Sequence, residues 1–83
     1  MKAKRYVKKP IVVFALQWTG NNKQDIIEFV DRHAKFDDKG NLIIKTLEGE
    51  MFAHKNDMIV KGIHNEFYPV KLDIFKKTYD VYT

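Results

Sequence analysis

The sequence predicts an α+β fold of two layers, in which one main helix packs on a mostly antiparallel sheet of four to six strands. One stretch in the N-terminal half has apolar residues at helical spacing. Short strand-like stretches follow it, and the turns between them are too short for the crossovers that parallel strands need. The 83 residues amount to a single domain, 1–83, with an apolar content of 45% that is enough for one compact core. The expected order is strand, helix and four strands, with room for a short C-terminal helix and a closing strand.

The first strand is expected in residues 11–18, IVVFALQW, because β-branched and aromatic residues favour the pleated conformation. Both of its faces are mostly apolar, which predicts a central strand that is covered at least in part on both sides. Gly20 then supplies a turn, and the side chain of Asn21 or Asn22 can accept a hydrogen bond from the first free N–H groups of the following helix.

The helix is expected in residues 23–34, where Ile26, Phe29, Val30 and His33 recur at the spacing of one helical face. Acidic residues lie in its first turns and basic residues lie near its end, as the helix dipole favours. The apolar stripe should therefore pack on one face of the sheet.

A meander of antiparallel strands is expected after the helix, since turn clusters alternate with strand-like stretches. Asn56 and Asn65 lie in two of these turns, and asparagine tolerates the left-handed backbone conformation better than most residues. Beyond them, Asp73 is placed to cap a helical turn, and residues 79–83 indicate a closing strand. The expected strands are 42–47, 50–54, 58–62 and 66–70, and the expected turns are 37–41, 48–49, 55–57 and 64–65.

The residues offer little for catalysis. The chain has no serine and no cysteine, so those nucleophiles are excluded, and its glycines are dispersed at turns rather than gathered in a phosphate-binding loop. His54, Asp57 and His64 could form a weak metal or acid–base site, but three ordinary histidines are the better interpretation. We therefore predict a protein that is not an enzyme and holds no metal or cofactor.

Positive charge is concentrated at the N-terminus. The net charge is +4, and residues 1–10 hold five lysines or arginines and no acid. This basic arm, 1–9, can attract an acidic protein or phosphate at long range, or it can be a frayed and solvated end. The absence of cysteine and of a long apolar run predicts a cytoplasmic protein with no membrane partner. The edge strands of a small sheet pair readily with another copy of the chain, so a homo-oligomer is a further alternative.

Lysines and aromatic residues alternate along the predicted meander, which is typical of a surface that binds single-stranded nucleic acid or a nucleotide. The same alternation is typical of a half-buried sheet with its lysines on the wet face, so both interpretations stay open. The residues concerned are Lys45, Phe52, Lys55, Lys61, Phe67, Tyr68 and Lys71.

Two blocks of the sequence are similar to a known family. RYVKKPIVVFALQWTGNN resembles Y-R-K-K-P-V-V-V-x-A-x-Q-W-T-G-D-N, the opening of the small phage and prophage proteins called PGDYG-like. LIIKTLEGEMFAHKNDMIVKGIHNEFYPVKLDIFKKTYDVY resembles the rest of that pattern, I-x-T-L-E-G-x-M-x-A-x-x-G-D-W-I-I-x-G-V-x-G-E-F-Y-P-C-K-P-D-I-F-x-x-T-Y. The chain departs from the pattern at Asn56 and Asn65, where the family has glycine, and at Met58, where it has an aromatic residue.

The resemblance implies an accessory protein of a phage or prophage. Small accessory phage proteins often act by binding, since they block a host protein, defence nucleases included, or sequester a signalling nucleotide. The resemblance therefore implies non-catalytic binding to a host cytoplasmic factor, in host takeover or counter-defence. A host protein is the leading partner, and nucleic acid or a nucleotide is the alternative.

Ten residues of the family-like blocks are candidates for contact with a partner or ligand. For Trp18 the alternative is a core position at the end of the first strand, and for Asp57 and Asp73 it is a turn or a helix cap. The candidates are Lys8, Lys9, Gln17, Trp18, Asp57, Lys61, Glu66, Tyr68, Lys71 and Asp73.

Overall fold

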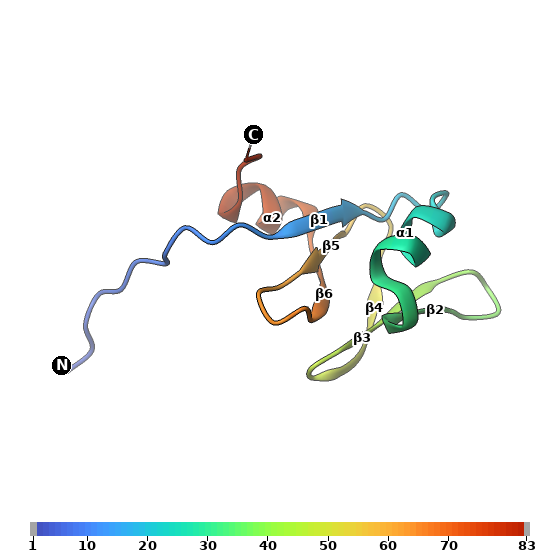
Figure 1. Cartoon of the computed structure of the whole chain (residues 1–83), viewed down its shortest axis with the longest axis horizontal. Coiled ribbons are helices and arrows are strands. Elements are labelled where there is room, and N and C mark those ends of the chain that lie inside the picture. The colour runs from blue at the N-terminus through green and yellow to red at the C-terminus, as the bar shows by residue number, and fades with distance from the viewer. Residues whose placement is uncertain (1, 83) are drawn as a thin grey trace.

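Residues 2–82, the part of the chain that this computed structural model describes, form two helices and two three-stranded antiparallel sheets (Figure 1). The predicted α+β class is confirmed, whereas the prediction of a single sheet of four to six strands is wrong. The elements in chain order are β1 (Phe14–Gln17), α1 (Lys23–Val30), a 3-10 turn (Asp31–His33), β2 (Ala34–Phe36), β3 (Leu42–Thr46), β4 (Gly49–Ala53), β5 (Met58–Lys61), β6 (Phe67–Val70) and α2 (Leu72–Thr78).

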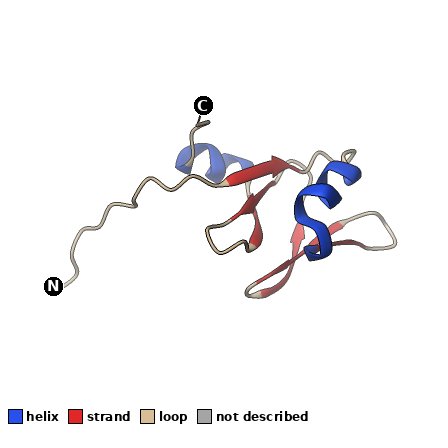
Figure 2. Ribbon diagram, in the orientation of Figure 1, coloured by secondary structure: helices blue, strands red, loops and turns tan. Residues whose placement is uncertain are grey.

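The strands divide into sheet A, with the order β1-β5-β6, and sheet B, with the order β2-β3-β4 (Figure 2). β1 is therefore an edge strand, which corrects the prediction of a central first strand. Its apolar residues are not covered along the whole strand, because Leu16 packs against the core whereas Phe14, on the same face, is 69% exposed. The predicted meander is also split, since β4 and β5 follow one another in the chain but pair with strands of different sheets.

The turn between β4 and β5 directs the chain from sheet B to sheet A. Asn56 has a φ of 78°, the left-handed conformation that the sequence predicts for this turn. Its N–H donates to the carbonyl oxygen of Trp18 at 2.6 Å, and the Trp18 N–H donates to the carbonyl oxygen of Asp57 at 2.9 Å. These two bonds continue the β1–β5 ladder into the turn, so β5 leaves beside β1 and not beside β4.

One apolar core joins the two sheets and α1. Ile26 and Val30 of the predicted helical stripe are fully buried in it. Phe67 of β6 connects the layers, because its ring meets that of Phe29 edge-on at 5.5 Å and lies 5.2 Å from the ring of His33. The helical face predicted from spacing is thus confirmed. The buried core side chains are Trp18, Ile26, Val30, Leu42, Ile44, Ala53, Ile59 and Phe67.

The loop before α1 is held by Asn22. This residue precedes the helix as predicted, but its side chain makes no capping bond. Instead, Oδ1 accepts the Thr19 N–H at 3.0 Å, and Nδ2 donates to the carbonyl oxygen of Gln17 at 2.8 Å. Asn22 therefore fastens the start of the helix to the end of β1.

α1 is shorter than the sequence predicts, because it ends at Val30 and not at residue 34. Asp31 has a φ of 58°, with which an α-helix cannot continue, and a single 3-10 turn begins there. Ala34–Phe36 then form β2, a strand that the sequence does not predict. Three residues are too few to show a strand period, and these three follow directly on a helical pattern.

A smaller cluster lies on the opposite face of sheet A. Val60 is fully buried, yet it points away from its neighbour Ile59, which belongs to the core. Tyr68 is the partner of Val60 across the β5–β6 pair. In the C-terminal segment, the ring of Tyr79 stacks on that of Phe75 with 4.8 Å between centroids.

The C-terminal segment forms α2, and Lys71 rather than Asp73 occupies the capping position. Asp73 lies in the first turn and makes no capping hydrogen bond, so its predicted role as a cap is wrong. Residues 79–82 form no closing strand, and residue 83 lies outside the described part of the chain.

The N-terminal segment 2–13, which contains the basic arm, forms no helix or strand and extends away from both sheets (Figure 1). It accounts for the elongated extents of 50 × 30 × 22 Å. The radius of gyration is 14.3 Å, whereas a compact chain of this length has a value of about 12 Å.

Candidate functional site

The ten candidate residues lie in three places in the structure. Three of them meet at the end of β1, two lie at the hairpin between β5 and β6, and five lie along the arm, β6 and the start of α2. In that order they are Gln17, Trp18 and Asp57; Lys61 and Glu66; and Lys8, Lys9, Tyr68, Lys71 and Asp73.

The contacts at the end of β1 hold the fold together. Asp57 is only 8% exposed, and its Oδ2 accepts the N–H of His54 at 2.9 Å and lies 3.7 Å from Nδ1 of the same histidine. Gln17 donates from Nε2 to the carbonyl oxygen of Asn56 at 3.1 Å. Trp18 is a buried member of the core. These contacts give all three candidates a place in the fold, and their contact with a partner stays a prediction.

The hairpin between β5 and β6 is shaped by Glu66. Its Oε1 accepts the N–H of His64 at 3.0 Å, and Asn65 has a left-handed φ of 61°. The Glu66 carboxylate occupies the space that a Cβ at Gly62 would fill, so any larger residue there would displace the carboxylate from the turn. Lys61 precedes this glycine and is partly buried. The local geometry therefore explains the hairpin without a ligand.

Lys8 and Tyr68 both approach Tyr79. The Lys8 ammonium lies over the Tyr79 ring, 5.8 Å from its centroid, which holds the base of the arm beside α2. Burial raises the pKa of Tyr68 to about 12, and hydrogen bonding with Tyr79 and the nearby Glu66 carboxylate add to the rise. Tyr68 is therefore a neutral phenol at physiological pH.

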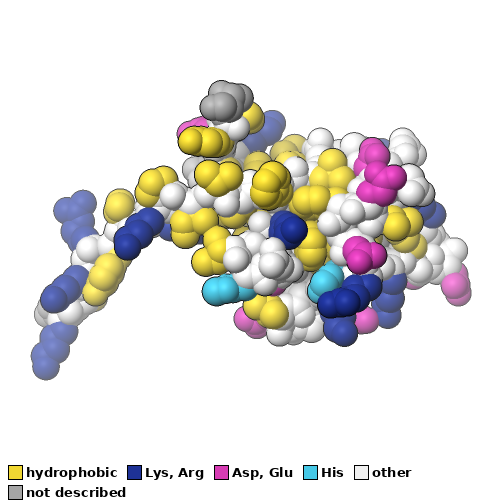
Figure 3. Space-filling view, viewed as in Figure 1, with side chains coloured by type: hydrophobic (Ala, Val, Ile, Leu, Met, Phe, Trp, Pro, Cys, Tyr) yellow, Lys and Arg dark blue, Asp and Glu magenta, His cyan; other side chains and the backbone are white. Residues whose placement is uncertain are grey.

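Large apolar side chains are exposed around the base of the arm (Figure 3). They come from the arm, from β1 and from the C-terminal segment, and Tyr6 and Val7 are 88% and 92% exposed. Within residues 2–82, β1 pairs only with β5, so the hydrogen-bonding groups of its outer edge are unpaired. We define the edge surface as this open edge together with Tyr6, Val7, Ile11, Val12, Phe14, Ile74, Val81 and Tyr82.

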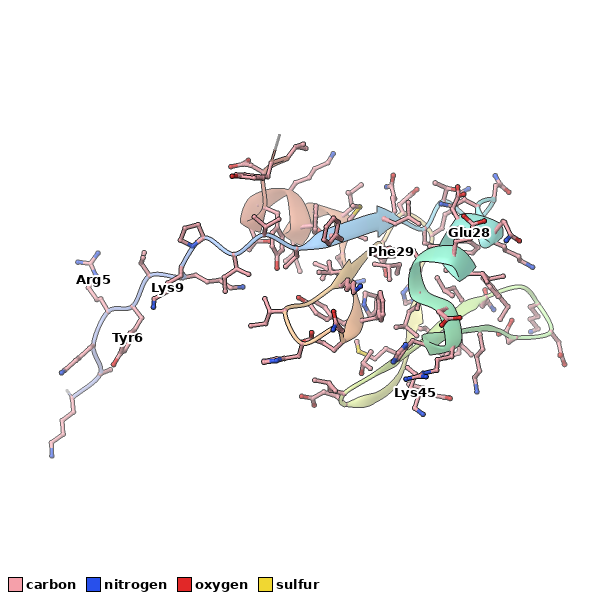
Figure 4. All side chains as sticks on the ribbon, viewed as in Figure 1. Arg5, Tyr6, Lys9, Glu28, Phe29 and Lys45 are labelled. Atoms are coloured by element: carbon pink, nitrogen blue, oxygen red, sulfur yellow. The ribbon has the colours of Figure 1, made fainter. Side chains whose placement is uncertain are left out.

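The sequence does not predict the edge surface, although the apolar residues of 11–18 are its signal. Apolar residues on both faces of a strand indicate coverage on both sides, and only the tertiary structure shows that the outer edge of β1 is open and that Phe14 is exposed. Figure 4 shows Arg5, Tyr6 and Lys9 projecting from the arm clear of the sheets. The arm thus presents basic and apolar groups together.

Sheet B presents a second exposed surface, which carries basic and apolar side chains. The register places Lys35, Ile43 and Phe52 side by side across its three strands, and it places Lys45 opposite Glu50. Phe52 is 58% exposed. A shallow depression of about 70 Å³ adds Arg32 to these neighbours. We define the sheet B face as Arg32, Lys35, Ile43, Lys45, Glu50 and Phe52.

The basic and aromatic residues that the sequence suggests for one nucleic-acid-binding face are divided by the fold. Lys45 and Phe52 lie on the sheet B face, whereas Phe67 is buried in the core. Lys55 lines a pocket of about 410 Å³ that Phe52 also lines. Lys61, Tyr68 and Lys71 lie in sheet A or directly after it.

The alternative metal or acid–base residues are also separated. His54 and Asp57 belong to the β4–β5 turn, whereas His64 belongs to the β5–β6 hairpin. Among the described residues, no group of three or more His, Cys, Asp or Glu is arranged to hold a metal ion.

No protein-family model, curated protein or solved structure matches this chain. The resemblance to the PGDYG-like phage proteins therefore stays a prediction from the two sequence blocks. In the part of the chain that the structure describes, neither helix has the length and apolar character needed to cross a membrane.

Proposed function

We propose that this protein is a non-catalytic binding module of a phage or prophage that inhibits or modulates a host cytoplasmic protein. The observation that carries this proposal is the edge surface, where an unpaired strand edge continues into a basic arm with exposed apolar side chains. An extended apolar surface with a polar surround is typical of a protein-binding site. The resemblance to the PGDYG-like proteins supports the phage context.

The partner adds an extended segment to the outer edge of β1. Main-chain hydrogen bonds to the unpaired N–H and C=O groups supply affinity in this mode of recognition, and alternate side chains supply specificity. Val12 and Phe14 are two residues apart, so in an extended backbone they point to the same side. They are 59% and 69% exposed and form the apolar contact for the partner.

The arm selects a partner with an acidic surface. It carries five basic residues, and the first acid of the chain is Asp25. Complementary charge accelerates association and disfavours basic partners. Lys8 lies over the ring of Tyr79, so the base of the arm passes next to the end of α2 and the other charges extend beyond it. The basic residues are Lys2, Lys4, Arg5, Lys8 and Lys9.

Capture from a lysate of the bacterial host, with crosslinking and mass spectrometry, tests this proposal. The wild-type protein is compared with Phe14→Asp, which places a charge in the edge surface without entering the core. Leu47→Asp is the matched control, because Leu47 is 79% exposed in the turn between β3 and β4. We expect a protein captured by the wild type and by Leu47→Asp but lost with Phe14→Asp.

Equal capture by both variants would contradict the proposal. Light scattering of the purified protein separates a host partner from a second copy of the chain. A dimer that Phe14→Asp dissociates would assign the edge surface to self-association and would likewise contradict the proposed host partner.

A further inference from the structure

We infer that the sheet B face is a separate binding surface and that its ligand is single-stranded nucleic acid. The inference goes beyond the proposed function, which uses only the edge surface. It is carried by the exposed aromatic ring of Phe52 on the outer strand β4, which has basic side chains across the neighbouring strands and Lys55 at the adjacent pocket.

The charge of this face suits a phosphate backbone. Arg32, Lys35 and Lys45 gather beside β2 and β3, and Lys55 lies beyond Phe52 at the pocket. Figure 3 shows Lys and Arg side chains gathered next to a histidine at the lower side of the molecule. The opposing charge of Glu50 is partly compensated, because its Oε2 lies 2.9 Å from Nζ of Lys35.

Phe52 provides a plane on which a base can stack. It belongs to β4, whose backbone is held by the ladder with β3, so the ring is presented from a rigid strand. Ile43 is its direct cross-strand neighbour and supports it on one side. Exposed aromatic residues on a sheet, flanked by basic groups, are the usual means of binding unstacked bases.

The pocket beside Phe52 offers room for a neighbouring nucleotide. Its volume of about 410 Å³ is within the ordinary range for small ligands. Gly20 and Gly40 form part of its wall, and both have positive φ values that favour glycine. Lys55 lines the pocket, whereas Nζ of Lys23, which lies near Gly40, sits over the Phe36 ring at 5.1 Å from its centroid. Lys55 is therefore the lysine available for a phosphate at this pocket.

A single strand fits these features better than a duplex does. Stacking on Phe52 requires a base that is not already stacked and paired, whereas a duplex would offer only phosphates to the face. Both DNA and RNA offer phosphates and unstacked bases to this face, and the experiment below distinguishes them.

Fluorescence anisotropy with labelled dT and rU oligomers of about 12 nucleotides tests the inference, with a duplex of equal length for comparison. We expect tighter binding of the single strands and an affinity that falls with salt, with a slope of about −0.7 for each phosphate contact. Phe52→Leu should weaken binding by about fivefold or more. Lys45→Gln should weaken binding and reduce the salt slope by about 0.7.

Two controls separate this face from the other basic parts of the molecule. Lys76→Gln removes the same charge from exposed α2 and should leave affinity nearly unchanged. The double variant K8Q/K9Q removes two charges from the arm. When Phe52→Leu is added to this variant, it should weaken binding by the same factor as in the wild type. The variants concern exposed side chains, and circular dichroism verifies that each is folded.

Four results would each overturn the inference. They are no binding at about 100 µM protein in low salt, equal affinity for duplex and single strand, affinity unaffected by Phe52→Leu, and loss of all binding with K8Q/K9Q alone. None of them bears on capture of a host protein through Phe14, so the inference and the proposed function fail separately. A preference for dT or for rU decides between DNA and RNA.

Discussion

The carboxylate of Asp57 accepts the backbone N–H of His54 at 2.9 Å, and this bond closes the turn at which the chain passes from sheet B to sheet A. The backbone of the same turn is bonded to Trp18 in both directions. The turn therefore acts as the junction between the two sheets, and its stability should be decisive for the fold.

Asp57→Ala should lower the free energy of unfolding by about 1–3 kcal/mol, because it leaves a part-buried backbone N–H without its acceptor. Urea unfolding followed by fluorescence measures this, since Trp18 is the single tryptophan and is buried. Asp38→Ala, at an exposed turn position, should stay within about 0.5 kcal/mol of the wild type. An unfolding midpoint of Asp57→Ala equal to that of Asp38→Ala would refute the role of this bond.

Gly62→Ala should destabilise the protein by about 0.5–1.5 kcal/mol, because the added Cβ displaces the flexible Glu66 carboxylate, which then gives up its hydrogen bond from the His64 N–H. A double-mutant cycle isolates this contact. In the background of Glu66→Ala, which removes the carboxylate, Gly62→Ala should cost clearly less. An equal cost in both backgrounds would mean that the backbone of the hairpin, and not the carboxylate, requires glycine.

The stability of the protein should fall in alkali because the pKa of Tyr68 is raised from 10.0 to about 12 by burial, with hydrogen bonding to Tyr79 as the next cause. The folded state holds the phenolic proton more tightly than the unfolded state does. This contribution is complete below pH 10.0 and is lost as pH rises from there through about 12.

Tyr68→Phe should remove the part of the stability loss above pH 10.0 that comes from ionisation of Tyr68. Urea unfolding midpoints measured below and above pH 10.0 test this. Tyr6→Phe is the control, because Tyr6 is 88% exposed. The prediction fails if the two variants show the same change in pH profile.

Asn41→Ala should raise the pKa of Asp37 toward its ordinary value of 3.8. The Asn41 side chain donates to Asp37 Oδ2 at 3.0 Å, and this bond is the main cause of the lowered pKa; the N–H groups of Asn41 and Lys39 also donate to the carboxylate. The associated stability is present above pH 3.8 and is lost as pH falls through the lowered pKa. Carboxyl NMR titration measures the shift, and Asn21→Ala should leave it unchanged.

The local elements could be predicted from the sequence because each depends on a few neighbouring residues. The spacing of Ile26, Phe29 and Val30 was sufficient for the face of α1, and Asn56 and Asn65 were sufficient for two left-handed turn positions. β2 escaped prediction because three residues show no period.

The candidate site was only partly predictable. Lys8 and Lys9 belong to the basic arm that the sequence makes evident, but the apolar residues beside them indicated a covered strand. Phe14 shows why this failed, since the core covers Leu16 on the same face of β1 but leaves Phe14 69% exposed. For Phe52 the sequence allowed two interpretations, because alternation of lysine and aromatic residues is typical both of a half-buried sheet with a wet face and of a ligand-binding face.

The sequence by itself determined the α+β class, the helical face, the turn positions and the concentration of positive charge at the N-terminus. Tertiary structure alone decided that the strands divide into two sheets and that β1 has an open edge. The physical reason is distance along the chain. Helical spacing and turn geometry act over a few residues, whereas the contact of Gln17 with Asn56 joins residues 39 positions apart. Local patterns specify which segments can pair, and only the assembled core decides which of them do.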